Sequence, residues 1–352
     1  MTIFDFAVIM MMLLAFAMKP VGYYPTGKCN KACNWYLMII GATLILISGL
    51  RHQSIGLDTY QYYSIYTSLP ENILKAFKDS RLEEGYILLN IMFKGLGFVY
   101  IPLSVSILFI GLTFYTIRKY SPSIMLSCLL FVVFCFYYRC FNEMRQAIAL
   151  GVICYSFKYV VEKNFTKYIV CIIIAALFHR TSLIFFPSIL LLYIDKIKWW
   201  QLGGLLAIAV FLAMNALVVI QKFVPFFQID YSNMEEGAGG WGLLAVQVMT
   251  FLLALLRFKY VKRDRTNVVL IYMLGMAIAM FPICHINPML FRLEDYYWIF
   301  IIFFVPRMIY TFNNRFIKNA VSIGYIIVGY FFYFNKIFSE SNNILPFKFL
   351  WE

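Results

Sequence analysis

Long apolar runs separated by short polar gaps make up most of this chain. A helix that spans a membrane needs about 20 mostly apolar residues, and many of the runs approach that length. The ten clearest runs cover residues 3–18, 34–50, 101–117, 123–138, 146–161, 202–220, 243–258, 267–283, 296–310 and 319–335. The pattern predicts an all-α integral membrane protein that forms a single polytopic domain over residues 1–352.

Two further runs do not fit a simple crossing. Residues 168–194 are apolar except for His179-Arg180-Thr181-Ser182 at their middle, and lysines flank both ends. Because both flanks are expected on one side, this run predicts a broken helical hairpin whose polar tip lines a cavity. Residues 84–99 carry Asn90 and Lys94, so they predict an amphipathic helix on the outer face. The chain would then cross the membrane about 12 times, with both termini outside.

Composition excludes a soluble domain. The chain is 62% hydrophobic and holds 36 Phe and 26 Tyr, more than a soluble interior can bury. Its net charge of +13 is concentrated in alternate gaps, which are 19–33, 118–122, 158–167, 195–201, 257–265 and 307–318. These gaps hold 18 of the 30 Lys and Arg but only 3 of the 17 Asp and Glu. Since Lys and Arg beside spanning helices stay in the cytoplasm, these gaps are expected inside, and no nucleic-acid partner is predicted.

The remaining gaps, expected on the outer side, contain the residues that could carry chemistry. Segments 51–63, 139–146 and 285–298 each place arginine at the end of an apolar run, and its planar fork of donors matches phosphate oxygens. His179 could accept a proton or bind an anion, and the Glu83-Glu84 pair could contact sugar hydroxyls or act as a general base. Each segment also has a plainer interpretation as a helix cap, a headgroup contact, an aromatic belt or polar packing.

Motifs for soluble cofactors are absent from the sequence. It contains no Walker loop, dinucleotide fingerprint, metal triad or nucleophile elbow. Eight cysteines are scattered, and the Cys29 and Cys33 pair has no second ligand pair nearby. We therefore expect neither a cofactor nor a metal ion.

Five short motifs, in order along the chain, carry a resemblance to a known family. They are Arg51…Gly56-Leu-Asp58-Thr59…Tyr62, Glu84-Gly-Tyr86, Asn142-x-x-Arg145-Gln146-x-x-Ala149, Phe178-His179-Arg180-Thr-Ser182, and Arg292-x-x-x-Tyr296-Tyr297 before a span that ends near Pro306. In this order they resemble the EpsG-like branch of the Wzy-type polysaccharide polymerases, over roughly residues 34–310.

The resemblance implies a membrane glycosyltransferase of polysaccharide biosynthesis, such as an O-antigen, capsule or exopolysaccharide polymerase. It would join oligosaccharide repeats carried on undecaprenyl diphosphate, as donor and acceptor, at the periplasmic or exterior face of a bacterial plasma membrane. The implied reaction is inverting and metal-independent: an acceptor hydroxyl attacks the anomeric carbon of the donor, and undecaprenyl diphosphate leaves. A chain-length regulator is an implied partner.

Residue roles follow from the same resemblance. The diphosphate would be held by Arg51, Arg145, Arg292 and Arg180, because preorganised donors in a low-dielectric site stabilise developing charge. The base for the hydroxyl would be His179, Asp58 or Glu84, with His179 preferred for its depth. Helix 84–99 would guide the lipid carrier. Sugar contacts are expected from Tyr62, Tyr86, Asn142, Gln146 and Tyr296.

Three other activities remain open at this point. An O-antigen ligase-like transferase would use similar arginines and the same donor but a different acceptor. A membrane O-acyltransferase would also use a buried His and Arg, although the inner loops lack a convincing site for its acyl donor. A lipid-linked glycan transporter or flippase would use the arginines as a substrate path, but such proteins often show an internal duplication, and none is visible here.

Overall fold

The computed structural model describes residues 2–22, 29–80, 82–223, 239–286, 288–338 and 343–352. Within them the chain is helical, with a single isolated β-bridge between Arg51 and Phe349. Five helices are long and apolar enough to cross a membrane: α2 (Lys31–Gly49), α6 (Tyr100–Tyr120), α11 (Trp199–Phe223), α14 (Arg265–Cys284) and α17 (Arg315–Phe338). The prediction of an all-α membrane protein is therefore confirmed, whereas the number of crossings stays a prediction.

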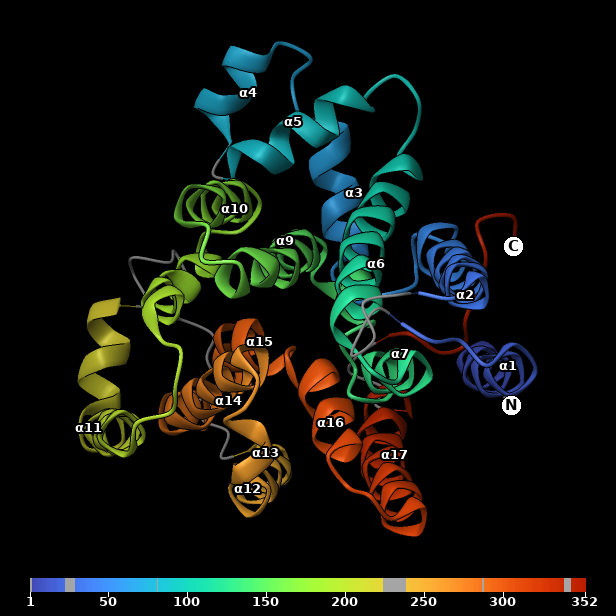
Figure 1. Ribbon diagram of the computed structural model, residues 1–352. Coiled ribbons are helices and arrows are strands. Elements are labelled where there is room, and N and C mark those ends of the chain that lie inside the picture. Colours follow the sequence, from blue (N-terminus) through green and yellow to red (C-terminus); the bar gives the residue numbers. More distant parts are fainter. Residues whose placement is uncertain (1, 23–28, 81, 224–238, 287, 339–342) are drawn as a thin grey trace.

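Shorter helices complete the bundle (Figure 1). The shorter apolar ones are α1 (Ile3–Met18), α7 (Ile124–Val133), α10 (Phe165–Phe178), the 3-10 helix η1 (Arg180–Tyr193) and α12 (Trp241–Leu256). The remaining ones are α3 (Thr59–Ser68), α4 (Ile73–Asp79), α5 (Glu84–Met92), α8 (Arg139–Asn142), α9 (Met144–Val161), α13 (Phe258–Val261), η3 (Pro288–Leu290), α15 (Phe291–Trp298) and α16 (Ile301–Tyr310).

Several expected boundaries differ from the observed ones. The amphipathic helix ends at Met92, because residues 93–99 form turns around Gly95 and Gly97. The expected loop 51–83 contains the helices α3 and α4, which the apolar pattern did not indicate. The expected span 296–310 is divided between α15 and α16. Most of the expected outer loop 221–242, with Glu235 and Glu236, lies outside the described residues.

The broken hairpin consists of α10 and η1, which meet at His179. A 3-10 helix rises about 2.0 Å per residue, so the 14 residues of η1 cover about 28 Å, nearly the thickness of a bilayer core. The tip therefore lies at the far end of the bundle from the flanks of the hairpin.

One end of the bundle is held by two arginines from the gaps expected in the cytoplasm. Arg265 donates to carbonyl oxygens at the ends of α9 and η1, including those of Val161 (3.1 Å) and Ile194 (2.6 Å). Arg307 of α16 pairs with Asp264 at 2.5 Å and donates to the carbonyl of Tyr120 at 2.8 Å. The ends of α6, α9, η1, α14 and α16 therefore meet here, as their shared charge pattern predicts.

The opposite end gathers the gaps expected outside. Helix α9 has 18 residues and is about 27 Å long, which separates Arg145 in its first turn from Val161 in its last. Both chain ends lie near this second end: Tyr333 near the end of α17 donates to Asp5 at 2.7 Å, and Leu350 N–H donates to the carbonyl of Leu50 at 2.9 Å.

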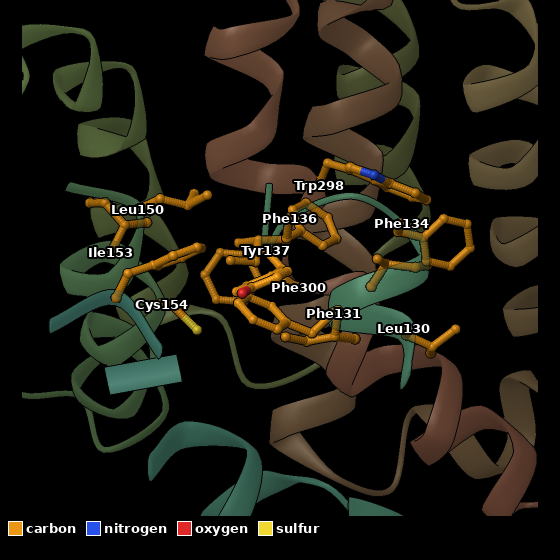
Figure 2. Packing of buried hydrophobic residues seen from close by; sticks show 14 of the residues in the cluster. Leu130, Phe131, Phe134, Phe136, Tyr137, Leu150, Ile153, Cys154, Trp298 and Phe300 are labelled. Atoms are coloured by element: carbon orange, nitrogen blue, oxygen red, sulfur yellow. The ribbon is translucent and has the colours of Figure 1, made fainter. Parts of the chain in front are cut away.

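A run of aromatic residues after α7 anchors this second end to the core (Figure 2). The Tyr137 side chain is fully buried, and its hydroxyl donates to the carbonyl of Leu44 at 2.8 Å. Phe134 lies edge-on to Trp298, with ring centroids 5.5 Å apart. Burial of such rings is strongly stabilising, so the chain just before Arg139 is held firmly in place.

Candidate functional site

Glu83 lies at the centre of one group of charged side chains at the second end. One carboxylate oxygen, Oε2, is 2.5 Å from Nη1 of Arg145. The other, Oε1, is 3.0 Å from Nδ1 of His179 and accepts a hydrogen bond from the Arg180 backbone N–H at 3.3 Å. Glu83 precedes α5, Arg145 begins α9 and His179 follows α10, so this carboxylate joins three separate elements.

A second group forms around Arg139 and Glu143. Arg139 pairs with Glu143 Oε2 at 2.5 Å and with Asp295 Oδ2 at 2.6 Å. The other oxygen of Glu143 is 3.1 Å from Nε of Arg292. The Asp58 carboxyl interacts electrostatically with Arg292, Glu143 and Arg145, which belong to both groups. We call Glu83, Arg139, Glu143, Arg145, His179, Arg292 and Asp295 together the charge cluster.

Acids and bases in the charge cluster differ in exposure. The side chains of Glu83 and Glu143 are 8% and 10% exposed, whereas those of Arg145 and Arg292 are 28% and 35% exposed. Buried carboxylates thus hold each guanidinium from beneath and leave part of it open to a ligand. An arginine held in this way is preorganised for an anion.

The acids at the helix ends show the electrostatic effect of these contacts. Burial raises the pKa of Glu83, but the hydrogen bond from His179 and the charge of Arg145 outweigh burial and lower it to about 2. Glu143 follows the same pattern: burial is outweighed by Arg139 and Arg292, which lower its pKa to about 2. Burial raises the pKa of Asp58, which makes it a better proton acceptor than an ordinary carboxylate.

Arg51 does not lie in the charge cluster. Its buried guanidinium donates to the carbonyls of Ser48, Ile55 (3.2 Å) and Phe141 (3.2 Å), and it lies over the Phe141 ring. These contacts use its donors within the protein. The expected phosphate contact of Arg51 is therefore replaced by a structural one, which fixes the loop before α3.

Gly56 and Asn142 complete that loop. Gly56 has φ +95°, and a Cβ there would lie 2.5 Å from the carbonyl oxygen of Phe141, so only glycine fits. The Asn142 side chain accepts a hydrogen bond from the Leu57 N–H at 2.8 Å. Asn142 therefore positions the loop that carries Asp58, and its burial leaves little surface for the expected sugar contact.

Glu84 is exposed, and among the described residues no ion pair joins it to the charge cluster. Glu83 precedes Tyr86 and Ile87 by three and four residues and shares their buried face, whereas Glu84 shares the exposed face of Leu88. The expectation of Glu84 as a base is thus corrected to Glu83 as the carboxylate in the site. Gly85 allows this approach, because a Cβ there would lie 2.7 Å from the Leu177 carbonyl oxygen.

The three tyrosines expected to bind sugar are buried. Tyr62 and Tyr86 pack edge-to-face at 5.6 Å, and Tyr62 also interacts with Arg145. The Tyr296 hydroxyl is 3.1 Å from Oγ1 of Thr181. Their burial favours packing between elements over the expected stacking on a sugar ring.

Gln146 and Arg180 occupy different positions at the site. The Gln146 side chain donates to the carbonyl of Arg292 at 2.8 Å, so it joins α9 to α15. Arg180 is half-buried beside Glu83, and in the described part of the chain no ion pair involves its guanidinium. Arg180 is therefore available to an anion, whereas Gln146 is a positioning residue.

Sequence reasoning left several members of the charge cluster without a role. Arg139, Glu143 and Asp295 all lie in segments that the pattern singled out, but their roles depend on contacts between α8, α9 and α15. The four-residue spacing of Arg139 and Glu143 was a usable signal for a pair on one helical face. Lys336, within electrostatic range of Arg139, Glu143 and Asp295, had no sequence signal.

The fold and the charge cluster define a polytopic helical membrane protein with a polar site at one end of its bundle. Among the described residues, no group of three His, Cys, Asp or Glu side chains could hold a metal ion. The model of the EpsG family matches residues 34–349, nearly the whole chain, and the chain belongs to this family. EpsG is a Wzy-type polymerase-like family, which indicates a polysaccharide polymerase. No curated protein and no solved structure matches the chain.

Proposed function

We propose that this protein lengthens a polysaccharide by joining lipid-diphosphate-linked oligosaccharide repeats at the outer face of a bacterial plasma membrane. The observation that supports this most is the partial exposure of Arg145 and Arg292 above buried carboxylates. A glycosyl diphosphate gains negative charge on the leaving oxygen as its bond to the sugar breaks. Preorganised donors stabilise that charge more than they stabilise the bound donor substrate, which is what catalysis requires.

In the proposed site the leaving diphosphate contacts Arg145, Arg292 and Arg180. These residues come from α9, α15 and the hairpin tip, and Glu83 and Glu143 orient the guanidinium groups of Arg145 and Arg292. Arg139 pairs with both Glu143 and Asp295 and so holds these two acids together. Arg51, Asn142 and Gln146 position the segments that carry these groups.

His179 is the proposed base. Its Nδ1 faces Glu83, so Nδ1–H donates to the carboxylate and the opposite nitrogen, Nε2, keeps its lone pair. That nitrogen takes the proton of the acceptor hydroxyl as the hydroxyl oxygen bonds to the anomeric carbon. The bond between that carbon and the diphosphate oxygen breaks, and the diphosphate leaves with the electron pair. Attack from the face opposite the leaving group inverts the anomeric centre.

Chain growth in detergent tests this proposal against transport. Purified protein is supplied with lipid-linked repeats, and the products are separated by length. We expect products of two or more repeats and release of undecaprenyl diphosphate, since joining repeats needs no second compartment. An intact, folded protein that leaves the repeats single would contradict the polymerase proposal and favour a transporter.

The acceptor decides between a polymerase and a ligase-like transferase, which share the donor chemistry. The same mixture is therefore repeated with lipid-linked repeats as the sole acceptor and with a second glycolipid acceptor added. Growth in the first mixture is the expected result. Transfer seen only after addition of the second acceptor would instead identify a ligase.

A further inference from the structure

An apolar groove of about 540 Å³ runs between α12 and α17. Its walls are side chains from these two helices, among them Val246, Met249, Val328 and Phe331. Gly242 and Gly324 also line it, and their missing side chains keep it open. Helix α16 lies between α12 and α17 (Figure 1), and most of α17 is not buried inside the protein. Because most of α17 is unburied, the groove on this helix would face the acyl region of a bilayer.

One end of the groove lies beside the charge cluster. Phe332 lines the groove and contacts Phe134, which contacts Trp298 of α15, with centroids 6.1 Å and 5.5 Å apart. Lys336 lies one helical turn beyond Phe332, about 6 Å along the axis of α17. It interacts electrostatically with Arg139 and Glu143. The groove thus leads from an apolar channel to a polar, charged end.

A hydrogen bond crosses the groove partway along its length. Oγ1 of Thr250 on α12 is 2.7 Å from the Tyr325 hydroxyl on α17. This contact ties the two helices together on the side away from the charge cluster. A ligand in the groove would therefore have its polar group near Lys336 and its apolar chain directed into the membrane.

We infer that this groove binds the isoprenoid chain of the lipid diphosphate, next to the headgroup, and sets the position of the diphosphate over Arg292. The inference rests on the proposed function and adds the place where the carrier is held. The isoprenoid chain already lies in an apolar environment, so its affinity for the groove comes from van der Waals packing against the groove walls and not from transfer out of water. The carrier would enter between α12 and α17, and not along α5 as the sequence suggested.

A leucine at position 324 tests the inference by filling the groove. A Cβ at Gly324 meets no atom within 4 Å, so Gly324→Leu adds bulk without a clash in the protein. Gly204→Leu on α11 is the matched control, because Gly204 is also in a spanning helix with open space around it. Val328→Trp fills the same groove from another position and guards against a folding defect in Gly324→Leu.

Binding of undecaprenyl diphosphate is measured in detergent, with phosphatidylglycerol as the comparison lipid. We expect Gly324→Leu and Val328→Trp to weaken binding of undecaprenyl diphosphate by about tenfold or more, because the added bulk occupies the groove, and Gly204→Leu to leave it unchanged. Binding at the wild-type level in both groove variants would overturn the inference. An equal loss for phosphatidylglycerol would also overturn it, by showing an ordinary lipid site.

Chain growth, measured in parallel, separates this inference from the proposed function. Wild-type protein that binds undecaprenyl diphosphate in the groove but never joins repeats would contradict the polymerase proposal alone. Growth by the wild type together with unaltered binding in the groove variants would contradict the groove alone.

Discussion

At the scale of single residues, the account depends on buried acids that hold partly exposed bases. Glu83 contacts Arg145 and His179 through different oxygens, so its removal would release both. The sequence motif indicated the pair Glu83 and Glu84. Only the buried face of α5 shows that Glu83 is the carboxylate in the charge cluster. Glu84 was chosen from sequence because it begins the Glu-Gly-Tyr motif; helical periodicity with Tyr86 would have selected Glu83.

Replacement of His179 tests its role as base. We expect His179→Gln to lower the rate of chain growth by about 10²- to 10⁴-fold, because glutamine can hydrogen-bond to Glu83 but cannot accept the proton. The rate is measured with purified protein and lipid-linked repeats. Glu84→Gln serves as the control and should retain the wild-type rate. A large loss in Glu84→Gln with an active His179→Gln would reverse the assignment.

Acid should weaken the contacts of Glu83. Its pKa in the folded protein, about 2, lies below the ordinary value of 4.5, so the ionised carboxylate stabilises the fold fully above pH 4.5. This stabilisation, on the order of a few kcal/mol, is lost as the pH falls from about 4.5 toward 2. Thermal unfolding in detergent should therefore depend less on pH across this window in Glu83→Gln than in the wild type.

Glu143 titrates in the same window, so the difference between wild type and Glu83→Gln is the quantity that matters. Equal pH dependence in the two proteins would show that Glu83 makes no ion pair in the folded state.

At the scale of elements, the apolar pattern located the bundle but not its irregular parts. Each of the ten predicted spans contains helical residues, because a continuous apolar run leaves the backbone no partners in a membrane other than its own. The 3-10 conformation of η1 was not predicted, since apolar periodicity does not distinguish it from an α-helix at this length. Helices α3 and α4 were missed because they have only 10 and 7 residues, and polar side chains interrupt their apolar ones, so neither forms a continuous apolar run.

Close packing of α5 on α10 should depend on Gly85. A methyl group there would meet the Leu177 carbonyl oxygen at 2.7 Å, so Gly85→Ala should push α5 away and separate Glu83 from His179. We expect a loss of about 1–3 kcal/mol of stability and a reduced rate of chain growth. Gly95→Ala is the control, because a Cβ there meets no atom within 4 Å. Equal thermal stability and activity in both variants would contradict this packing.

At the scale of the whole molecule, charge patterning predicted which gaps share an end. The contacts of Arg265 and Arg307 at one end, and of Glu83 and Arg139 at the other, follow that division. The sequence does not predict that α8, α9, α15 and the hairpin tip meet. Each of these elements buries only part of its surface, and many helix packings would satisfy the same pattern of apolar and charged residues. The position of Lys336 shows this, since α17 reaches the site only through tertiary packing.

The basic gaps predict the orientation in the membrane, and labelling can measure it directly. Ser54 is exposed at the end that carries the charge cluster, and Lys196 is exposed at the opposite end. In intact cells a membrane-impermeant maleimide should label Ser54→Cys and should label Lys196→Cys only after permeabilisation. The unsubstituted chain measures background from the native cysteines. The reverse labelling pattern would place the charge cluster in the cytoplasm and contradict the proposed reaction site.

The central claim is that carboxylate-held arginines stabilise a departing diphosphate. Its most direct test is the single-turnover release of undecaprenyl diphosphate by purified Arg145→Ala and Arg292→Ala, with Arg315→Ala as the control. Arg315 is exposed at the start of α17, so its removal should leave the rate unchanged. Loss of one preorganised donor should slow release by about 10²- to 10³-fold in each site variant. Release at the wild-type rate from folded Arg145→Ala and Arg292→Ala would contradict the account.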